Sequence, residues 1–303
     1  MKHLRTLTYI AAVAKTGSIR KTADQVNITA SALNRKIQDF ERELGTKIFD
    51  RLAGGVRPNA AGELILRHIR DGLSDFERVR SQIADLSGMR RGHVAIACSQ
   101  AFANYFMPEQ ISRYRAQFPL VSFEVRVIDH HDAIAALNAH EVDLALVLQP
   151  PAGTIFQILF SCVQPLCAMM AIGHPLAAPG PVRLRECLRY PLIVPDQTTA
   201  GRYLYDMAAH RAGIEGNVVV TSSSFEFLQN YLLREPLVGF QVMSGLPPPE
   251  QRERSGLAFR RVDSRDAPGA TMALGQLRGR ALPVAAAKFA EQVSKSIDQQ
   301  SVS

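Results

Sequence analysis

Residues 17–44 of this chain read GSIRKTADQVNITASALNRKIQDFEREL. This pattern predicts two helices joined by a sharp turn. Ser18 can cap a first short helix, because a serine hydroxyl accepts a hydrogen bond from an N–H group of the first helical turn. Asn27 tolerates the left-handed backbone of a tight turn, and Thr29 can cap a second helix over residues 30–44.

The second helix is predicted to have a buried apolar face and an exposed polar face. The apolar face, at helical spacing, comprises Ala32, Leu33, Ile37, Phe40 and Leu44. The polar face suits a DNA major groove, where Asn pairs with adenine, Arg pairs with guanine, and both hold phosphates. The predicted DNA contacts of the helix pair are Ser18, Thr29, Ser31, Asn34, Arg35, Lys36 and Gln38. An ordinary solvated amphipathic helix would show the same pattern.

The distribution of charge favours the DNA-binding interpretation. Residues 1–60 contain 11 Lys and Arg against 5 Asp and Glu, a net charge of +6, whereas the whole chain carries +7. The remaining 243 residues are therefore almost neutral, with 24 basic and 23 acidic side chains. Concentrated positive charge is typical of a module that binds a nucleic acid duplex, because neutralising phosphates releases counterions. A membrane surface is the weaker alternative, since no helix places large exposed apolar residues beside the charges.

A short hairpin is predicted directly after the helix pair. The segment KIFDRLAGGVRP, residues 47–58, has two adjacent glycines with Arg51 and Arg57 on either side. Such a β-turn could form a wing that lays arginines along a DNA backbone or into a minor groove. A solvated hairpin with two surface arginines is the alternative. Its position after a basic helix pair favours the wing.

A long helix is predicted from Ala60 to about Ser87, capped by Asn59. Its apolar residues keep a heptad-like spacing that predicts a dimer seam made of Leu66, Ile69, Leu73, Phe76 and Ile83. A dimer would place two copies of the DNA-contacting helix, residues 30–44, on two DNA half-sites. A seam this short could instead pack on the body of the same chain.

The rest of the chain, from His93, alternates apolar strand-like runs with helical stretches. Residues 93–148 follow the order βαβαβ, which predicts a parallel sheet with helices on both faces. A second unit of this kind begins near residue 163, and the tail from Leu257 supplies two more strands and a last helix. We therefore expect two α/β lobes joined by two crossovers, with a ligand bound between them at the carboxyl ends of the strands.

The chain resembles the LysR-type transcriptional regulators over nearly its full length. The motifs that carry the resemblance are TYIAAVAKTGSIRKTADQVNITASALNRKIQDFERELGTKIFDR, NAAGE, EVDLALV, GHPLA and YPLIV. The resemblance implies an α/β fold class with an N-terminal all-α winged helix-turn-helix, a linker helix and a two-lobed periplasmic-binding-protein-like effector domain. The implied domains are a DNA-binding domain (1–59), a dimerising linker helix (60–88) and an effector-binding domain (89–303). Lobe 1 would span about 89–161 plus 263–303, and lobe 2 about 162–262.

The sequence departs from the family pattern at three places. The family's recognition helix usually starts with Ser-Gln, where this chain has Thr29 and Ala30, so the preferred DNA sequence should differ. The Leu-Thr pair that follows the wing is here Pro58-Asn59, and Asn59 preserves the capping role. REPLVGF replaces a Gly-x-Gly segment near the ligand cleft, so the backbone near Leu237 need not follow that of the family.

The resemblance also points to an effector pocket built from the ends of strands. The implied effector-binding residues are Ser99, Gln100, Ala101, Gln149, Thr198, Thr199, Arg202, Phe240 and Gln241. Thr198 and Thr199 precede a helix N-terminus, where N–H groups and the helix dipole favour an anion, and Arg202 offers a fork for a carboxylate. We therefore predict a small carboxylate effector. The alternative is that the threonines only cap the helix and Arg202 is solvated.

Other chemistry is sparse in the sequence. Its N-terminus lacks a convincing signal peptide, and no apolar stretch is long enough to span a bilayer comfortably, so a cytoplasmic protein with reduced cysteines is expected. No metal, cofactor or catalytic motif is recognisable, so an enzyme with an appended DNA module is the weakest hypothesis. The leading one is a regulator that binds double-stranded promoter DNA as a dimer or tetramer and responds to a small molecule. A thiol-based redox regulator using Cys162 or Cys167 is the alternative.

Overall fold

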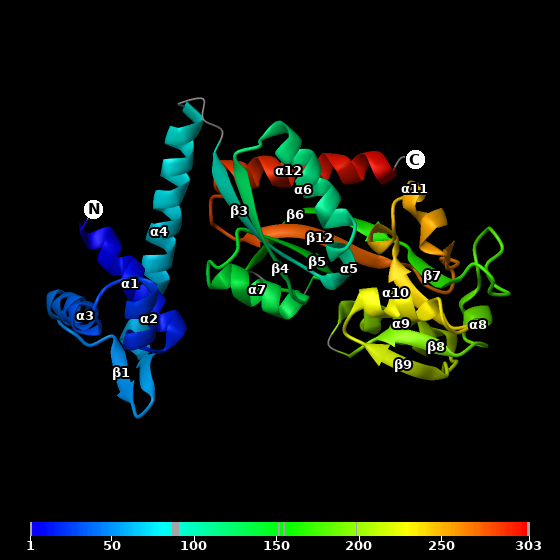
Figure 1. Ribbon diagram of the computed structural model, residues 1–303, viewed down its shortest axis with the longest axis horizontal. Helices are drawn as coiled ribbons and strands as arrows, with labels where there is room; N and C mark the ends of the chain where they lie inside the picture. Colours follow the sequence, from blue (N-terminus) through cyan, green and yellow to red (C-terminus); the bar gives the residue numbers. More distant parts are fainter. Residues whose placement is uncertain (1, 87–90, 151, 154, 198, 302–303) are drawn as a thin grey trace. The chain divides into compact units, whose positions relative to one another are not determined.

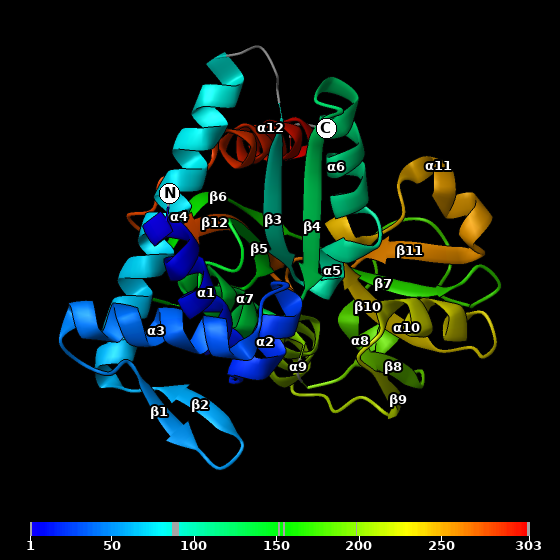
Figure 2. The same cartoon turned by 60° about the vertical axis from the view of Figure 1, so that its left-hand side comes forward.

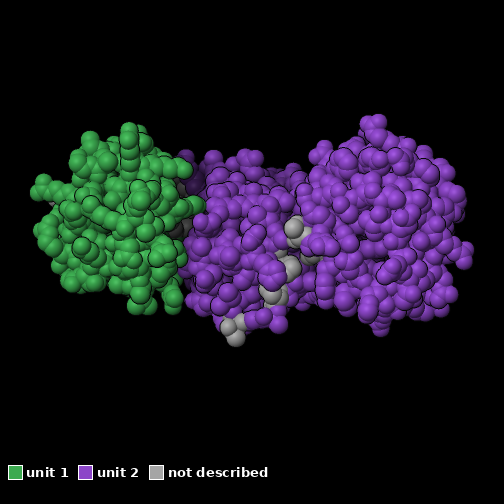
Figure 3. Space-filling view, turned by 90° about the horizontal axis from the view of Figure 1, so that it is seen from below, with its two compact units in different colours: residues 1–83 green, residues 84–303 purple. Residues whose placement is uncertain are grey.

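A computed structural model describes residues 2–86, 91–150, 152–153, 155–197 and 199–301. The chain divides into two compact units, Met1–Ile83 and Ala84–Ser303 (Figure 3). The boundary expected between linker helix and effector domain, residues 88 and 89, lies outside the described residues.

Unit 1 is a helix-turn-helix followed by a two-stranded wing and a long helix (Figures 1 and 2). The two wing strands pair antiparallel. The elements are α1 (Lys2–Thr16), α2 (Ile19–Gln25), α3 (Ala30–Leu44), β1 (Phe49–Leu52), β2 (Gly55–Pro58) and α4 (Ala60–Leu86).

The predicted caps and turn of the helix pair are confirmed. The Ser18 hydroxyl accepts a hydrogen bond from the Lys21 N–H, 3.3 Å away, and so caps α2. Thr29 caps α3 in the same way, with 3.2 Å between its hydroxyl and the Ala32 nitrogen. Asn27 has a φ of 54°, the left-handed conformation expected for the sharp turn. Local side-chain chemistry therefore fixes where both helices begin.

The predicted apolar face of α3 is correct at its centre and wrong at its ends. Leu33 and Ile37 are buried in the core of unit 1, and Phe40 packs against that core. Ala32 and Leu44 are exposed instead. They lie in the first and last turns of the helix, beyond the side chains of α1, α2 and α4 that cover its centre.

The seam predicted on α4 divides into two parts. Leu66 and Ile69 are fully buried in the core of unit 1, and Leu73 packs against the same core. Their assignment to a dimer seam is therefore wrong for Leu66 and Ile69, because the helix-turn-helix already covers them. Phe76 is 40% exposed and Ile83 is 59% exposed, so the second half of the helix keeps an accessible apolar side.

Unit 2 contains two sheets, each with helices packed on it, which we call lobe 1 and lobe 2. Lobe 1 has the strand order β4-β3-β5-β12-β6. β3 is parallel to β4 and β5, which confirms the parallel arrangement predicted for residues 93–148. β12 is antiparallel to both of its neighbours, so the sheet as a whole is mixed. The strands are β3 (Gly92–Cys98), β4 (Val121–Val127), β5 (Leu144–Leu148), β6 (Phe156–Gln164) and β12 (Ala270–Leu277). The helices are α5 (Gln100–Ala103), α6 (Phe106–Gln117), α7 (His130–Asn138) and α12 (Val284–Ser301).

Lobe 2 has the strand order β11-β7-β10-β8-β9. The segment REPLVGF, which departs from the family pattern, leads into β10, and this strand lies at the centre of the sheet. The strands are β7 (Leu166–Ala171), β8 (Leu192–Pro195), β9 (Val218–Ser222), β10 (Val238–Val242) and β11 (Leu257–Arg261). The helices are α8 (Leu184–Cys187), α9 (Ala200–Ala212), α10 (Phe225–Leu232), η1 (Met243–Gly245), α11 (Pro249–Arg252) and η2 (Glu253–Ser255).

The chain crosses between the lobes twice, from β6 into β7 and from β11 into β12 (Figure 1). At the first crossing the Ser244 hydroxyl donates to the Gln164 side chain over 2.6 Å. Near the last helix a buried ion pair joins Arg280 to Asp143, with 2.9 Å between them. Asp143, the acidic residue of the EVDLALV motif, also accepts from the Ala95 N–H at 3.0 Å. This carboxylate therefore links β3 to the segment between β12 and α12.

Candidate DNA-binding surface and effector site

The polar face of α3 is accessible over its first turns. Ser31, Arg35, Lys36 and Gln38 are exposed, and Asn34 is half-buried. Among the residues that the structure describes, none forms an ion pair with Arg35 or Lys36. These cations therefore remain available for an anionic partner, in contrast to Arg42, which pairs with Asp39 at the far end of the helix.

The wing exposes both of its arginines. Arg51 lies across the ladder from Val56, and Arg57 lies across from Asp50. Because directly opposed residues point to the same face of a sheet, the two arginines project from opposite faces of the ribbon. Val56 packs against the core of unit 1, so the ribbon is anchored on that face. The wing and α3 thus offer cations from two separate elements.

The candidate effector residues of lobe 1 follow the end of β3. Ser99 is buried, and its hydroxyl accepts from the Leu148 N–H at 3.3 Å. The side-chain oxygen of Gln100 is buried without a hydrogen-bond partner among the described residues. The carbonyl of Ala101 lies against Gly245 of lobe 2, where an added Cβ would come within 2.4 Å of it. Gln100 is therefore the member of this group that has unused hydrogen-bonding capacity.

Two candidates on β10 have their side chains occupied within lobe 2. Phe240 is 3% exposed and stacks on Tyr205, with 5.5 Å between the ring centroids, so its prediction as an effector contact is wrong. Alternation along the strand turns this side chain into the core of lobe 2. The Gln241 side chain is also buried, and its oxygen accepts from the Val242 N–H at 2.8 Å. It also lies beside Gly245, the residue that the Ala101 carbonyl of lobe 1 approaches.

The anion site predicted at the start of α9 is largely occupied by the protein itself. The Thr199 hydroxyl caps the helix by accepting from the Arg202 N–H at 3.3 Å, and it donates to the Asp196 carbonyl at 3.0 Å. The Arg202 side chain pairs with Asp206. Thr198 lies outside the described residues. The start of α9 therefore has fewer free hydrogen-bond donors for an anion than its sequence indicates.

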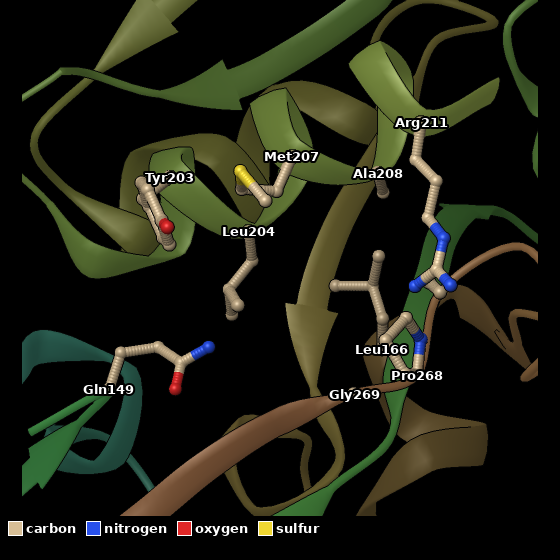
Figure 4. A pocket seen from close by; sticks show the side chains of 10 residues that line it. Gln149, Leu166, Tyr203, Leu204, Met207, Ala208, Arg211, Pro268 and Gly269 are labelled. Atoms are coloured by element: carbon tan, nitrogen blue, oxygen red, sulfur yellow. The ribbon is translucent and has the colours of Figure 1, made fainter. Parts of the chain in front are cut away.

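A cavity of about 140 Å³ lies beside α9, along the face that carries Tyr203, Met207 and Arg211. Figure 4 shows the amide of Gln149 directed into it from lobe 1 and the Arg211 side chain reaching along its opposite wall. Gln149 directly follows β5 and has a φ of 51°, a strained conformation of the kind that often occurs at functional sites. The cavity is lined by Gln149, Leu166, Tyr203, Leu204, Met207, Ala208, Arg211, Ala267, Pro268 and Gly269.

Of the residues that line this cavity, sequence reasoning identified Gln149 and missed the others. Tyr203, Met207 and Arg211 recur every four residues on α9, so their shared face was readable from the sequence. Leu166 begins β7, directly after the first crossover between the lobes, and residues 267–269 belong to the second crossover. No local signal marks them, because they are distant from α9 in sequence and approach it only through the tertiary fold.

Three of the four cysteines are buried. The described residues contain no cluster of side chains suited to binding a metal ion. Burial raises the pKa values of the Cys98 and Cys167 thiols to about 12. Cys162 is half-buried and accepts from the Gln164 amide at 3.1 Å. Within the described ranges, no group of three or more His, Cys, Asp or Glu side chains could hold a metal ion. None of the helices in those ranges is long and apolar enough to cross a membrane.

This arrangement, a winged helix-turn-helix followed by a two-lobed α/β domain, defines a class of bacterial regulator. The family model "Bacterial regulatory helix-turn-helix protein, lysR family" matches residues 4–63. The model "LysR substrate binding domain" matches residues 87–297. The chain therefore belongs to the LysR family of transcriptional regulators.

Several curated relatives are themselves named as regulators. The chain is 32% identical over 174 residues to the HTH-type transcriptional regulator CbbR of Sinorhizobium medicae. That match covers 57% of this chain and 55% of the relative, so it spans about half of the relative's length. The HTH-type transcriptional activator CmpR of Synechocystis is 22% identical, over 72% of each chain.

Solved structures share the fold. Full-length CbnR, in a crystal structure of its complex with target DNA, gives a TM-score of 0.62 at 17% identity, over 97% of this chain and 99% of that one. A full-length OxyR variant from Pseudomonas aeruginosa gives a TM-score of 0.72 at 18% identity, over 96% of this chain and 94% of that one. At these identities the likeness concerns the fold alone.

Proposed function

We propose that this regulator binds promoter DNA through α3 and the wing. The observation that carries the proposal is the exposed face of α3, where Arg35 and Lys36 have no ion-pair partner among the described residues. Supporting it, residues 1–60 carry almost all of the net charge of the chain. The structural likeness to CbnR, whose structure was determined with its target DNA, also agrees with it. A DNA partner implies that the protein works in the cytoplasm.

The test is DNA affinity as a function of salt, using a duplex from the region upstream of the chain's own gene. We expect a steep fall in affinity with salt, because each phosphate contact releases counterions. Arg35→Ala should cost about 1–3 kcal/mol and relax the sequence preference. Arg42→Ala, on the same helix but paired with Asp39, is the matched control and should change little. A shallow salt dependence would count against the proposal.

The proposed effector is a small molecule with an apolar body and a carboxylate, bound in the cavity beside α9. Leu166, Leu204 and Met207 supply apolar contacts, while Arg211 and Gln149 supply a cation and an amide at its edges. Arginine suits a carboxylate because its planar fork donates two parallel hydrogen bonds. Arg202, the anchor expected from the sequence, already pairs with Asp206. Arg211 is therefore the better candidate.

Thermal unfolding against a panel of small carboxylates and their neutral amides tests this proposal. A ligand at a hundred times its dissociation constant should stabilise the protein by about 2.7 kcal/mol, enough to move a melting curve. The effect should require the carboxylate and should be lost in Arg211→Ala. If Arg202→Ala abolishes it and Arg211→Ala does not, the anion binds at the start of α9 instead. If no compound shifts the curve, the effector belongs to another chemical class.

The protein is also proposed to self-associate through the second half of α4. Phe76, Val79 and Ile83 are all at least 40% exposed and follow one another at spacings of three and four residues. Exposed apolar side chains at this spacing form a stripe that a second helix can cover. A dimer of this kind would carry two copies of α3 to two half-sites on DNA, and two dimers could form a tetramer.

A further inference from the structure

The wing of unit 1 is attached to the helix-turn-helix by a close backbone contact. The N–H of Val56 donates to the carbonyl of Gly17, with 2.8 Å between nitrogen and oxygen. Gly17 ends the turn after α1, and the next residue, Ser18, caps α2. The contact therefore joins β2 to the turn that precedes α2, the first helix of the helix-turn-helix. The two residues are separated by 38 others in the sequence.

This contact is possible because residue 55 has no side chain. A Cβ on Gly55 would lie 2.2 Å from the carbonyl oxygen of Gly17 and 3.3 Å from its carbon. Neither of these is a flexible side-chain atom, so any larger residue would push the wing away from the turn. Gly54, its neighbour in the same hairpin, would meet nothing within 4 Å if a Cβ were added.

The anchored part of the wing holds both of its arginines. Arg57 follows Val56 directly, and Arg51 lies across the ladder from Val56. A two-stranded hairpin alone is marginally stable in water, so its orientation depends on what it packs against. Here it is held by the Gly17 carbonyl and by the packing of Phe49 and Val56 in the core.

We infer that Gly55 is a positioning residue for DNA binding, which holds the wing at a fixed place relative to α3 so that Arg51 and Arg57 meet the duplex together with Arg35. The inference rests on the proposed role of the wing in DNA binding. The inference assigns this positioning role to Gly55 and assigns no role to its neighbour Gly54. It also implies that the wing is in place before DNA binds.

The test compares Gly55→Ala with Gly54→Ala in the full-length chain, using the same upstream duplex. Gly55→Ala should weaken binding by about tenfold or more and lower the salt slope by about one for each arginine that loses its phosphate. Gly54→Ala should bind like the original protein. A Gly55→Ala variant that keeps the original affinity and salt slope, or a Gly54→Ala variant with the same losses, overturns the inference.

A double-mutant cycle separates positioning from a general loss of stability. Arg57→Ala should weaken binding by itself, and adding it to Gly55→Ala should cause little further loss, because both changes remove the same contact. Fully additive losses would overturn the inference. If Arg57→Ala and Arg51→Ala have no effect, the wing does not contact DNA and the inference falls with it. Arg35→Ala then shows separately whether DNA binding through α3 still stands.

Amide hydrogen exchange of the unmodified protein tests the anchor even if Gly55→Ala does not fold. The Val56 N–H should exchange about as slowly as the amides of buried residues in α3, such as Leu33, without DNA. Exchange as fast as that of the exposed Gly54 amide would mean that the wing is not fixed before binding. That result would overturn the inference independently of any variant.

Discussion

Arg202 and Asp206 form an ion pair along one turn of α9, with 2.8 Å between Nε of Arg202 and Oδ1 of Asp206. The guanidinium also lies 5.9 Å from the ring centroid of Tyr205 and within 3.5 Å of the Pro195 carbonyl. An arginine at a helix start therefore does not by itself indicate a free anion site. Its own helix can supply the carboxylate.

Arg202→Ala should change the free energy of unfolding by no more than about 1 kcal/mol. The Asp206 side chain is 48% exposed, and pairs that reach solvent gain little because water screens them. Urea unfolding of the full chain measures the change, and Asp206→Ala should give a similar small value. A loss several times larger would show that the contacts with Tyr205 and Pro195 dominate.

Arg280→Ala should destabilise unit 2 much more, by about 3–5 kcal/mol. Both side chains of the Arg280–Asp143 pair are only 11% exposed, so the change leaves a buried carboxylate without its cation. Lys295→Ala is a matched control, because its pair with Glu291 is largely exposed on both sides. We expect urea unfolding to separate the two variants clearly. Equal losses would contradict the assignment of Asp143 as a buried tie.

Stability should fall as pH rises above about 9. Burial raises the pKa of the Cys98 thiol to about 12, and the same holds for Cys187. An unfolded thiol ionises near pH ~8.5, so above that pH the unfolded chain releases protons that the native chain keeps. The unfolding free energy should then drop by up to about 1.4 kcal/mol per pH unit for each buried thiol.

Urea unfolding between about pH 8 and about pH 10 checks this slope. Cys98→Ala should reduce the slope by the share of one buried thiol, and Cys162→Ala, at a half-buried position, should leave it unchanged. A thiol-based redox regulator would require a cysteine that is ionised to the thiolate near neutral pH. The raised pKa of Cys167 disfavours that alternative. A DNA-binding response to oxidant that Cys162→Ala or Cys167→Ala abolishes would revive it.

Much of unit 1 was readable from the sequence because its signals are local. Ser18, Asn27 and Thr29 act on their own turns, and the structure shows each in its expected role. The positions of α3 and the wing follow from such caps and from paired glycines. The anchoring of the wing on Gly17 was not readable, because the two partners are distant in sequence and both are backbone groups.

The proposed effector site was harder to predict because it depends on long-range contacts. The family resemblance pointed to Phe240 and Arg202, but stacking on Tyr205 and pairing with Asp206 occupy them. Gln149 was found because it directly follows a strand. Arg211 was missed because a charged residue in the last turn of a helix usually only interacts with the helix dipole.

The two halves of α4 should respond differently to substitution. Leu66→Ala should destabilise unit 1 by about 2–5 kcal/mol, because this fully buried side chain leaves a cavity in the core. Ile83→Ser should cost little stability, since the side chain is 59% exposed, but should weaken self-association. Urea unfolding measures the first effect, and sedimentation over a range of protein concentrations measures the second. If Ile83→Ser and Phe76→Ser both leave the oligomeric state unchanged, the second half of α4 is not the interface, and the regulator associates through another surface.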